Sequence, residues 1–182
     1  MTAIVAGDII TRYTVTTGAA GDSVANTTVS TFLGKYAATS IWTGGSLNDL
    51  FPDISGAQNA ASQVDYAGLA VLNNNASNIL QNAVAYISAE TALGAVIAIG
   101  ADTTAASAKG AAGAQLVTIA SSTTAPAGAS FSAPTTLGTG IALGAIGIAQ
   151  VKGLWIRRTA SASAALSADG FTLAVAGDTG SL

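Results

Sequence analysis

Short apolar runs alternate with turn-forming residues along the chain, and few windows repeat apolar residues at the spacing of an amphipathic helix. The clearest period is two. Residues 9–17 show it well, because Tyr13 and Val15 face one way and Arg12 faces the other. This alternation is typical of a strand with one buried face, so the pattern predicts a protein built mainly from β-strands.

Further strands are predicted where apolar runs lie between turn residues, at residues 64–73, 79–88, 95–100, 115–120, 151–159 and 171–176. The first two of these are separated by the turn-prone run Asn73-Asn74-Asn75, and we expect them to form a hairpin. Only residues 57–64 and 103–112 offer short helices, and the second stretch fits a loop equally well.

Strands at this spacing favour an all-β fold, an antiparallel β-sandwich of immunoglobulin-like or jelly-roll type. We assign this domain to residues 61–182. Residues 1–60 include a polar stretch at 18–30 and have too few apolar side chains for a core of their own. They are interpreted as an extended N-terminal arm with short strands, whose large side chains rest on the sandwich or on another chain.

The composition removes many kinds of chemistry. The 182 residues include no cysteine and no histidine, which excludes disulfides, thiol nucleophiles, Cys/His zinc sites and every catalytic pair that needs these side chains. Six basic and nine acidic residues give a net charge of −3, without the dense basic surface on which nucleic-acid binding depends. We therefore expect no cofactor, no metal and no nucleic-acid partner.

The mean hydropathy of +0.54 is high for a soluble protein, but much of it comes from alanine. The uncharged window at residues 136–151 is shorter than the roughly 18–20 residues that a membrane span needs. The N-terminus lacks the basic start of a signal peptide. We therefore expect a soluble protein that is made in the cytoplasm and has no membrane partner.

Two motifs suggest catalytic or nucleotide chemistry and are better explained by turns. Gly138-Thr139-Gly140 resembles the start of a dinucleotide-binding loop, but the position of its third glycine holds Leu143. Asp49 and Asp53 flank a Phe-Pro pair, and other aspartates stand near turns (Asp102, Asp169 and Asp178). Two carboxylates could act on a glycosidic bond, yet aspartate beside Asn, Gly or Pro is usually a turn or cap residue. An enzyme is therefore the least favoured alternative.

The candidate contact residues are large or basic side chains in an otherwise small and uncharged chain. The only basic cluster contains Lys152, Trp155 and a pair of arginines, and too few aromatic residues surround it for an RNA-stacking surface. We expect the arginine pair to meet an aspartate or a partner chain, with an ion pair between chains favoured and a solvated surface as the alternative. The residues predicted to contact a partner are Phe32, Tyr36, Trp42, Phe51, Arg157 and Arg158.

Several segments, in a fixed order over residues 46–179, resemble a family of small virion proteins from tailed bacteriophages. The first are Leu50-Phe51-Pro52-Asp53-Ile54-Ser55-Gly56 and Val64-Asp65-Tyr66, followed by Leu80-Gln81-Asn82-Ala83-Val84-Ala85-Tyr86-Ile87. The later ones are Thr124-Ala125-Pro126-Ala127-Gly128, Phe131-Ser132-Ala133-Pro134-Thr135, Gly153-Leu154-Trp155-Ile156-Arg157-Arg158-Thr159, Asp169-Gly170-Phe171-Thr172 and Gly177-Asp178-Thr179. The chain departs from the family at Ala67-Gly68, and its first 45 residues carry little of the resemblance.

The resemblance implies a structural virion protein without catalytic residues, similar to capsid decoration or cement proteins. Such a protein would be made in the host cytoplasm and would bind the major capsid protein on the capsid surface as a homo-oligomer, with a trimer favoured. The alternative is a phage tail or adhesion component that contacts other tail proteins or a host glycan. Trp42 with Asn48 and Asp49 is the candidate glycan site.

Overall fold

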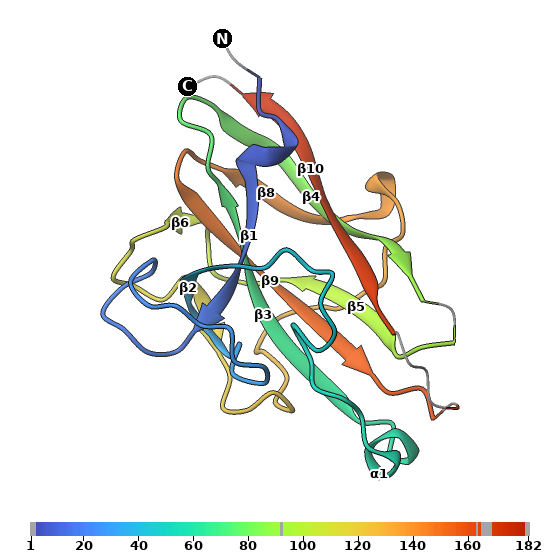
Figure 1. The fold of residues 1–182 in the computed structure, drawn as a ribbon. Helices are drawn as coiled ribbons and strands as arrows, with labels where there is room; N and C mark the ends of the chain where they lie inside the picture. Colours follow the sequence, from blue (N-terminus) through green and yellow to red (C-terminus); the bar gives the residue numbers. More distant parts are fainter. Residues whose placement is uncertain (1–2, 92, 163, 165–168, 181–182) are drawn as a thin grey trace.

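The computed structural model describes residues 3–91, 93–162, 164 and 169–180, which form two antiparallel sheets and very little helix (Figure 1). The strands of the larger sheet are β1 (Ile9–Val15), β2 (Gly34–Ile41), β3 (Val64–Asn73), β5 (Val96–Ala101), β6 (Ser107–Ala108), β7 (Leu116–Thr118) and β9 (Gln150–Thr159). Their order is β5-β9-β3-β1-β2-β7, and β6 pairs with β9 beyond the end of β5. This sheet is strongly curled, like half of a barrel.

The smaller sheet has the order β10-β4-β8, where β10 is Phe171–Gly180, β4 is Ile79–Glu90 and β8 is Ile141–Ile146. The helical elements are the single turn α1 (Gly56–Ala60) and the 3₁₀ turns η1 (Ala6–Asp8) and η2 (Leu137–Thr139). No helix among the described residues is long and apolar enough to cross a membrane. The all-β, antiparallel character predicted from the sequence is confirmed.

The middle parts of the two central strands, β3 and β9, are buried on both faces, which is why residues 67–72 and 153–156 are continuous apolar runs. In β3, Leu69 and Val71 face the smaller sheet and join the main core cluster. Ala70 and Leu72 face the opposite side and join a second cluster beneath the loops. The same alternation in β9 places Leu154 and Ile156 in the main core and Trp155 in the second cluster.

Trp155 is fully buried and organises the second cluster. Its indole N–H donates to Oδ2 of Asp102 at 2.6 Å, and this buried carboxylate also accepts the backbone N–H groups of Thr104 and Val117. The ring packs so closely on Gly68 that an added Cβ would lie 3.2 Å from it. Burial lowers the pKa of Lys152, although the nearby Asp102 charge opposes this.

Residues 1–60 do not form the arm that the sequence predicted. β1 and β2 lie inside the larger sheet, where β1 pairs with both β2 and β3. Ala37 and Ala38 of β2 are completely buried. Small side chains give a weak hydrophobic signal in a sequence, yet here neighbouring strands and loops cover them, so the segment needs no core of its own.

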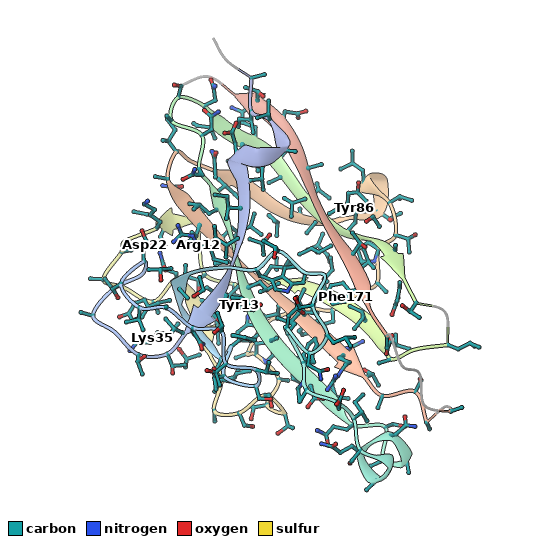
Figure 2. The ribbon with its side chains drawn as sticks, viewed as in Figure 1. Arg12, Tyr13, Asp22, Lys35, Tyr86 and Phe171 are labelled. Carbon is teal, nitrogen blue, oxygen red and sulfur yellow. The ribbon has the colours of Figure 1, made fainter. Side chains whose placement is uncertain are left out.

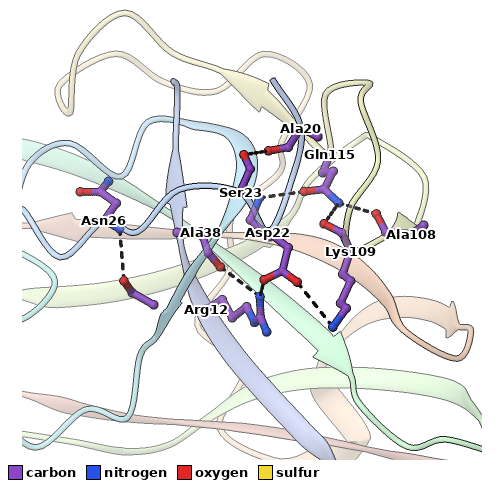
Figure 3. A network of polar contacts seen from close by, with 11 residues as sticks. Arg12, Ala20, Asp22, Ser23, Asn26, Ala38, Ala108, Lys109 and Gln115 are labelled. Atoms are coloured by element: carbon purple, nitrogen blue, oxygen red, sulfur yellow. Dashed lines mark hydrogen bonds and ion pairs between the residues drawn. The ribbon is translucent and has the colours of Figure 1, made fainter. Parts of the chain in front are cut away.

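A network of polar contacts ties the polar stretch after β1 to the rest of the molecule (Figure 3). Arg12 forms an ion pair with Asp22, and Lys109 Nζ lies 3.4 Å from the same carboxylate. Gln115 accepts the Ala37 N–H and donates to the Ala108 and Lys109 carbonyls. Burial alone would raise the pKa of Asp22, but the hydrogen bonds and charges of Arg12 and Lys109 together outweigh it, so the pKa is lowered.

The strands predicted at residues 64–73 and 79–88 are confirmed as β3 and β4, but the prediction that they pair as a hairpin is wrong. β3 pairs with β1 and β9, whereas β4 pairs with β10 and β8 in the other sheet. The buried Asn73 donates to the carbonyls of Asn78 and Ile146, and Asn75 accepts the N–H groups of Ser77 and Asn78. These side chains hold the loop as a crossing between sheets.

The other predicted strands are confirmed as β1, β5, β7, β9 and β10, with ends that differ by a few residues. The helix expected near residues 57–64 is the single turn α1, which Ser55 caps. Residues 103–112 contain β6 and turns rather than a helix. β2 and β8 were not predicted from the sequence as separate strands.

Candidate functional site

A groove of about 990 Å³ lies where the loop after β2, the β4–β5 turn, the end of β9 and the start of β10 meet. In Figure 1 the last three of these lie together at the lower right. The volume is at the upper end of the roughly 300–1,000 Å³ that small-molecule sites occupy. The side chains that shape it are Trp42, Leu47, Asn48, Asp49, Phe51, Asp53, Glu90, Arg158, Asp169 and Phe171.

An aromatic pair forms one wall of the groove. Trp42 stacks on Phe171 with ring centroids 6.0 Å apart, and its indole N–H donates to Oδ2 of Asp49 at 3.0 Å. Burial raises the pKa of Asp49, and the hydrogen bond from Trp42 only partly offsets this. Figure 2 shows Phe171 on β10, with Tyr13 on β1 in the interior. The aromatic pair joins two segments that are far apart in the sequence.

A buried ion pair supports the opposite wall. Arg158 on β9 lies directly across from Asp65 on β3, and its Nη2 donates to Oδ2 of Asp65 at 2.8 Å. Nη1 donates to the Pro52 carbonyl at 2.7 Å, and the guanidinium lies 4.7 Å from the ring centre of Phe51. Arg158 therefore holds the loop that contains Phe51 against the sheet.

Most of the carboxylates in the groove accept hydrogen bonds from backbone N–H groups of this chain. Glu90 accepts the Ile97 N–H at 2.7 Å, and Asp169 accepts the Ala95 N–H at 2.6 Å. Asp53 is exposed at the rim. Four carboxylates thus line the groove together with one cation, Arg158, whose charge Asp65 balances. No group of three or more metal-ligating side chains occurs among the described residues.

Exposed apolar side chains lie in this groove and at an adjoining hollow. Leu47 is 73% exposed and lines it, and Leu93 is 84% exposed beside an adjoining hollow that it shares with Val96. Ile41, also exposed, precedes Trp42. Exposed apolar clusters of this kind mark sites of interaction with other molecules.

The structure brings three of the six predicted contact residues to the groove: Trp42, Phe51 and Arg158. Phe32 is buried and stacks on Tyr13 at 4.5 Å, and the buried Tyr36 donates to the Ala112 carbonyl. With Phe51, which is also buried, they have little surface left for a partner in this conformation. Their contact with another chain stays a prediction.

The arginine pair divides between two surroundings. Arg158 meets an aspartate, which was one of the two expectations, and this ion pair lies within the chain rather than between chains. Arg157 lies 5.3 Å from the ring centre of Phe131, which packs on Tyr66. The described residues include no acidic partner for Arg157. Lys152 donates to the carbonyls of Asp102 and Thr104, away from both arginines.

Four residues at or beside the groove were not predicted from the sequence as site residues: Phe171, Leu47, Leu93 and Glu90. Phe171 appeared only as the first residue of a predicted strand and in one segment of the resemblance, and the other three carry no motif. Of the predicted turn aspartates, Asp49, Asp53 and Asp169 line the groove, whereas Asp102 is buried beneath Trp155.

Comparison with protein-family models, with curated proteins and with solved structures finds no match to this chain.

Proposed function

We propose that this chain is a structural protein of a phage particle, a decoration or cement protein that binds the major capsid protein on the capsid surface. The observation that carries the proposal is the exposed Leu47 in the groove, with Leu93 and Val96 exposed at an adjoining hollow, while the polar groups of the groove are mostly bonded within the chain. Such a surface is suited to binding a partner rather than to moving protons. The resemblance to small virion proteins adds support.

A cement protein stabilises a shell by burying surface across the joints between capsid subunits. Each contact can be modest, since many copies on one lattice act together. Burying one exposed leucine contributes about 1.5–3 kcal/mol, so Leu47 and its apolar neighbours suit this role. We propose no catalytic role and no cofactor. A homotrimer made in the host cytoplasm remains the expected form of the free protein.

We further infer that the two sheets form an open antiparallel sandwich. One core cluster contains Leu69 and Leu154 from the larger sheet together with Leu80 and Ile146 from the smaller one, which supports this interpretation. An immunoglobulin-like or jelly-roll topology remains a prediction.

A phage tail or adhesion component that binds glycan is the second candidate, because Trp42, Asn48 and Asp49 all line the groove. We rank it lower for a specific reason. The indole N–H of Trp42 already donates to Asp49, and its ring stacks on Phe171, so less of Trp42 is left for a sugar. Glycan-array binding at micromolar affinity would favour this candidate.

The first test is the ratio of this chain to major capsid protein in purified particles, measured by quantitative mass spectrometry. Hundreds of copies in a simple ratio to the shell protein are expected. A few to a few tens of copies would move the protein to the tail or a vertex. Absence from the particle would refute a structural role.

The second test asks whether the groove is the contact surface. Leu47→Ser should reduce the occupancy of particles about tenfold without changing the melting temperature, because this side chain is 73% exposed. Leu137→Ser is the matched control, since Leu137 is also exposed but lies outside the groove lining. Equal occupancy for the two variants would contradict this assignment of the surface.

A further inference from the structure

The outer edge of β10 differs from the other sheet edges of the described chain. β7 has only three residues, and β5 is covered at Ile99, which exchanges two backbone hydrogen bonds with Ser132. β8 has six residues and contains Gly144 in the left-handed conformation, whereas β10 is longer, although both strands shift register twice against β4. β10 has ten residues, ends its sheet, and no described strand pairs with its outer side. Proteins normally shorten, cover or charge such edges.

The direction of the free backbone groups follows from the register. Ile87 of β4 donates its N–H to the Pro134 carbonyl, away from β10. Its partner across the ladder is Leu173, so this is a pair without mutual hydrogen bonds. Alternation then directs the N–H and C=O groups of Leu173 and Val175 to the outer edge. The side chains of both residues still pack on the core.

The open edge leads directly into the groove, because Phe171 and Thr172 belong to both. The groove presents four carboxylates, and the only cation among its described lining residues, Arg158, is already paired with Asp65. Trp42 and Phe171 stack on each other but both stay partly exposed, so they add some aromatic surface beside these charges. A positively charged side chain complements both features, since cations bind carboxylates and aromatic faces.

We propose that β10 receives an extended segment of a partner chain by strand addition, and that a Lys or Arg of this segment enters the groove beside Trp42. In this mode the backbone supplies affinity through the Leu173 and Val175 edge, and the groove supplies specificity. The inference rests on the proposed function, because it gives the chemistry of the partner segment that docks at this end of the molecule.

The test is selection of binding peptides from a random dodecapeptide library displayed on filamentous phage, with the full chain as target. We expect the enriched peptides to share a Lys or Arg at one position, flanked by residues that favour strands. A synthetic copy of an enriched peptide should bind Asp53→Asn two- to fivefold more weakly than the unaltered chain. Asp53 suits this test because it is exposed at the rim. Enrichment of acidic peptides, or no enrichment, would overturn the proposal.

Strand addition is tested separately from the charge of the peptide, by removing backbone hydrogen bonds. Val175→Pro removes one outward N–H and should weaken peptide binding at least tenfold relative to Val175→Ala, which loses similar packing but keeps the N–H. Peptides N-methylated at alternate residues provide a test that leaves the protein unchanged. One of the two alternating sets should lose binding and the other should keep it. Equal binding of both sets would refute strand addition.

Sedimentation of the free protein tests whether a second copy of this chain, rather than a different partner, occupies the edge of β10. If the chain is an oligomer that Val175→Pro converts to a monomer, a second copy occupies the edge and the proposal is wrong. The copy number in particles tests the proposed function separately. Few copies per particle together with selective binding of basic peptides would reject capsid decoration and retain the partner chemistry.

Discussion

The ion pair between Arg158 and Asp65 gives the sharpest test of how the groove is held. Arg158→Met removes both hydrogen bonds of the guanidinium and leaves Asp65, which is 4% exposed, without its cation. Removing one partner of a buried pair costs about 3–5 kcal/mol. Gln63 still donates to Asp65, and methionine retains the contact with Phe51. We therefore expect a loss near the lower limit, about 3 kcal/mol.

For a chain of this length, that loss corresponds to a fall in melting temperature of about 6–12 °C. Urea unfolding followed by circular dichroism measures it directly. Arg158→Lys keeps the charge but cannot reach both Pro52 and Asp65, so it should lose about half as much. Hydrogen exchange should speed up in the loop around Phe51, because Arg158 holds its backbone.

The decisive comparison is the double variant Asp65→Leu with Arg158→Met. Replacing both members of a buried pair by apolar residues is often close to neutral, so the double variant should be more stable than Arg158→Met alone. One refuting result is a free energy of unfolding for Arg158→Met that lies within about 1 kcal/mol of that of the unaltered chain. The other is a double variant that is as unstable as Arg158→Met. Either result would show that the ion pair does not hold the groove.

Two further predictions concern aspartates outside the groove. Asp102→Asn places an amide N–H₂ against a donor in either orientation, because Oδ2 accepts from Trp155 and Val117 and Oδ1 accepts from Thr104. It should lower the free energy of unfolding by about 1–3 kcal/mol, and an unchanged urea midpoint would contradict this. Asp22→Asn should cost about 1.5–3 kcal/mol at pH 7. The pKa of Asp22 is lower in the folded than in the unfolded chain, so its stabilisation is present above the unfolded pKa and is lost as the pH falls through the folded one. The difference between Asp22→Asn and the unaltered chain should therefore shrink below about pH 4, and a difference that stays constant with pH would refute the role of the charge.

Local patterns predicted most of the strands because the side chains of a strand are apolar on its buried face and smaller or polar on the other. In β10, Phe171, Leu173 and Val175 alternate with smaller or polar residues, and all three pack on the core. β2 was not predicted because its side chains do not show which face is buried. Its buried centre is Ala37-Ala38, and alanine carries little information about burial until neighbours cover it.

The groove was only partly predictable. Trp42, Phe51 and Arg158 stood out as large or basic residues in a chain of small ones. Their partners did not, because Phe171 meets Trp42 and Asp65 meets Arg158 only through the fold and the strand register. No spacing along the sequence reports such a register, since it depends on which strands become neighbours.

The sequence by itself determined that the chain is mainly β, that thiol and imidazole chemistry is absent, and which large side chains were available for contacts. These properties depend on composition and on period-two patterns, which are local. Only the tertiary structure decided that β1 and β2 belong to the larger sheet, that β3 and β4 lie in different sheets, and that Arg158 is paired within the chain. It also left the edge of β10 open beside an acidic groove. These outcomes depend on pairing between distant segments, where the free energy comes from surfaces that meet only after folding.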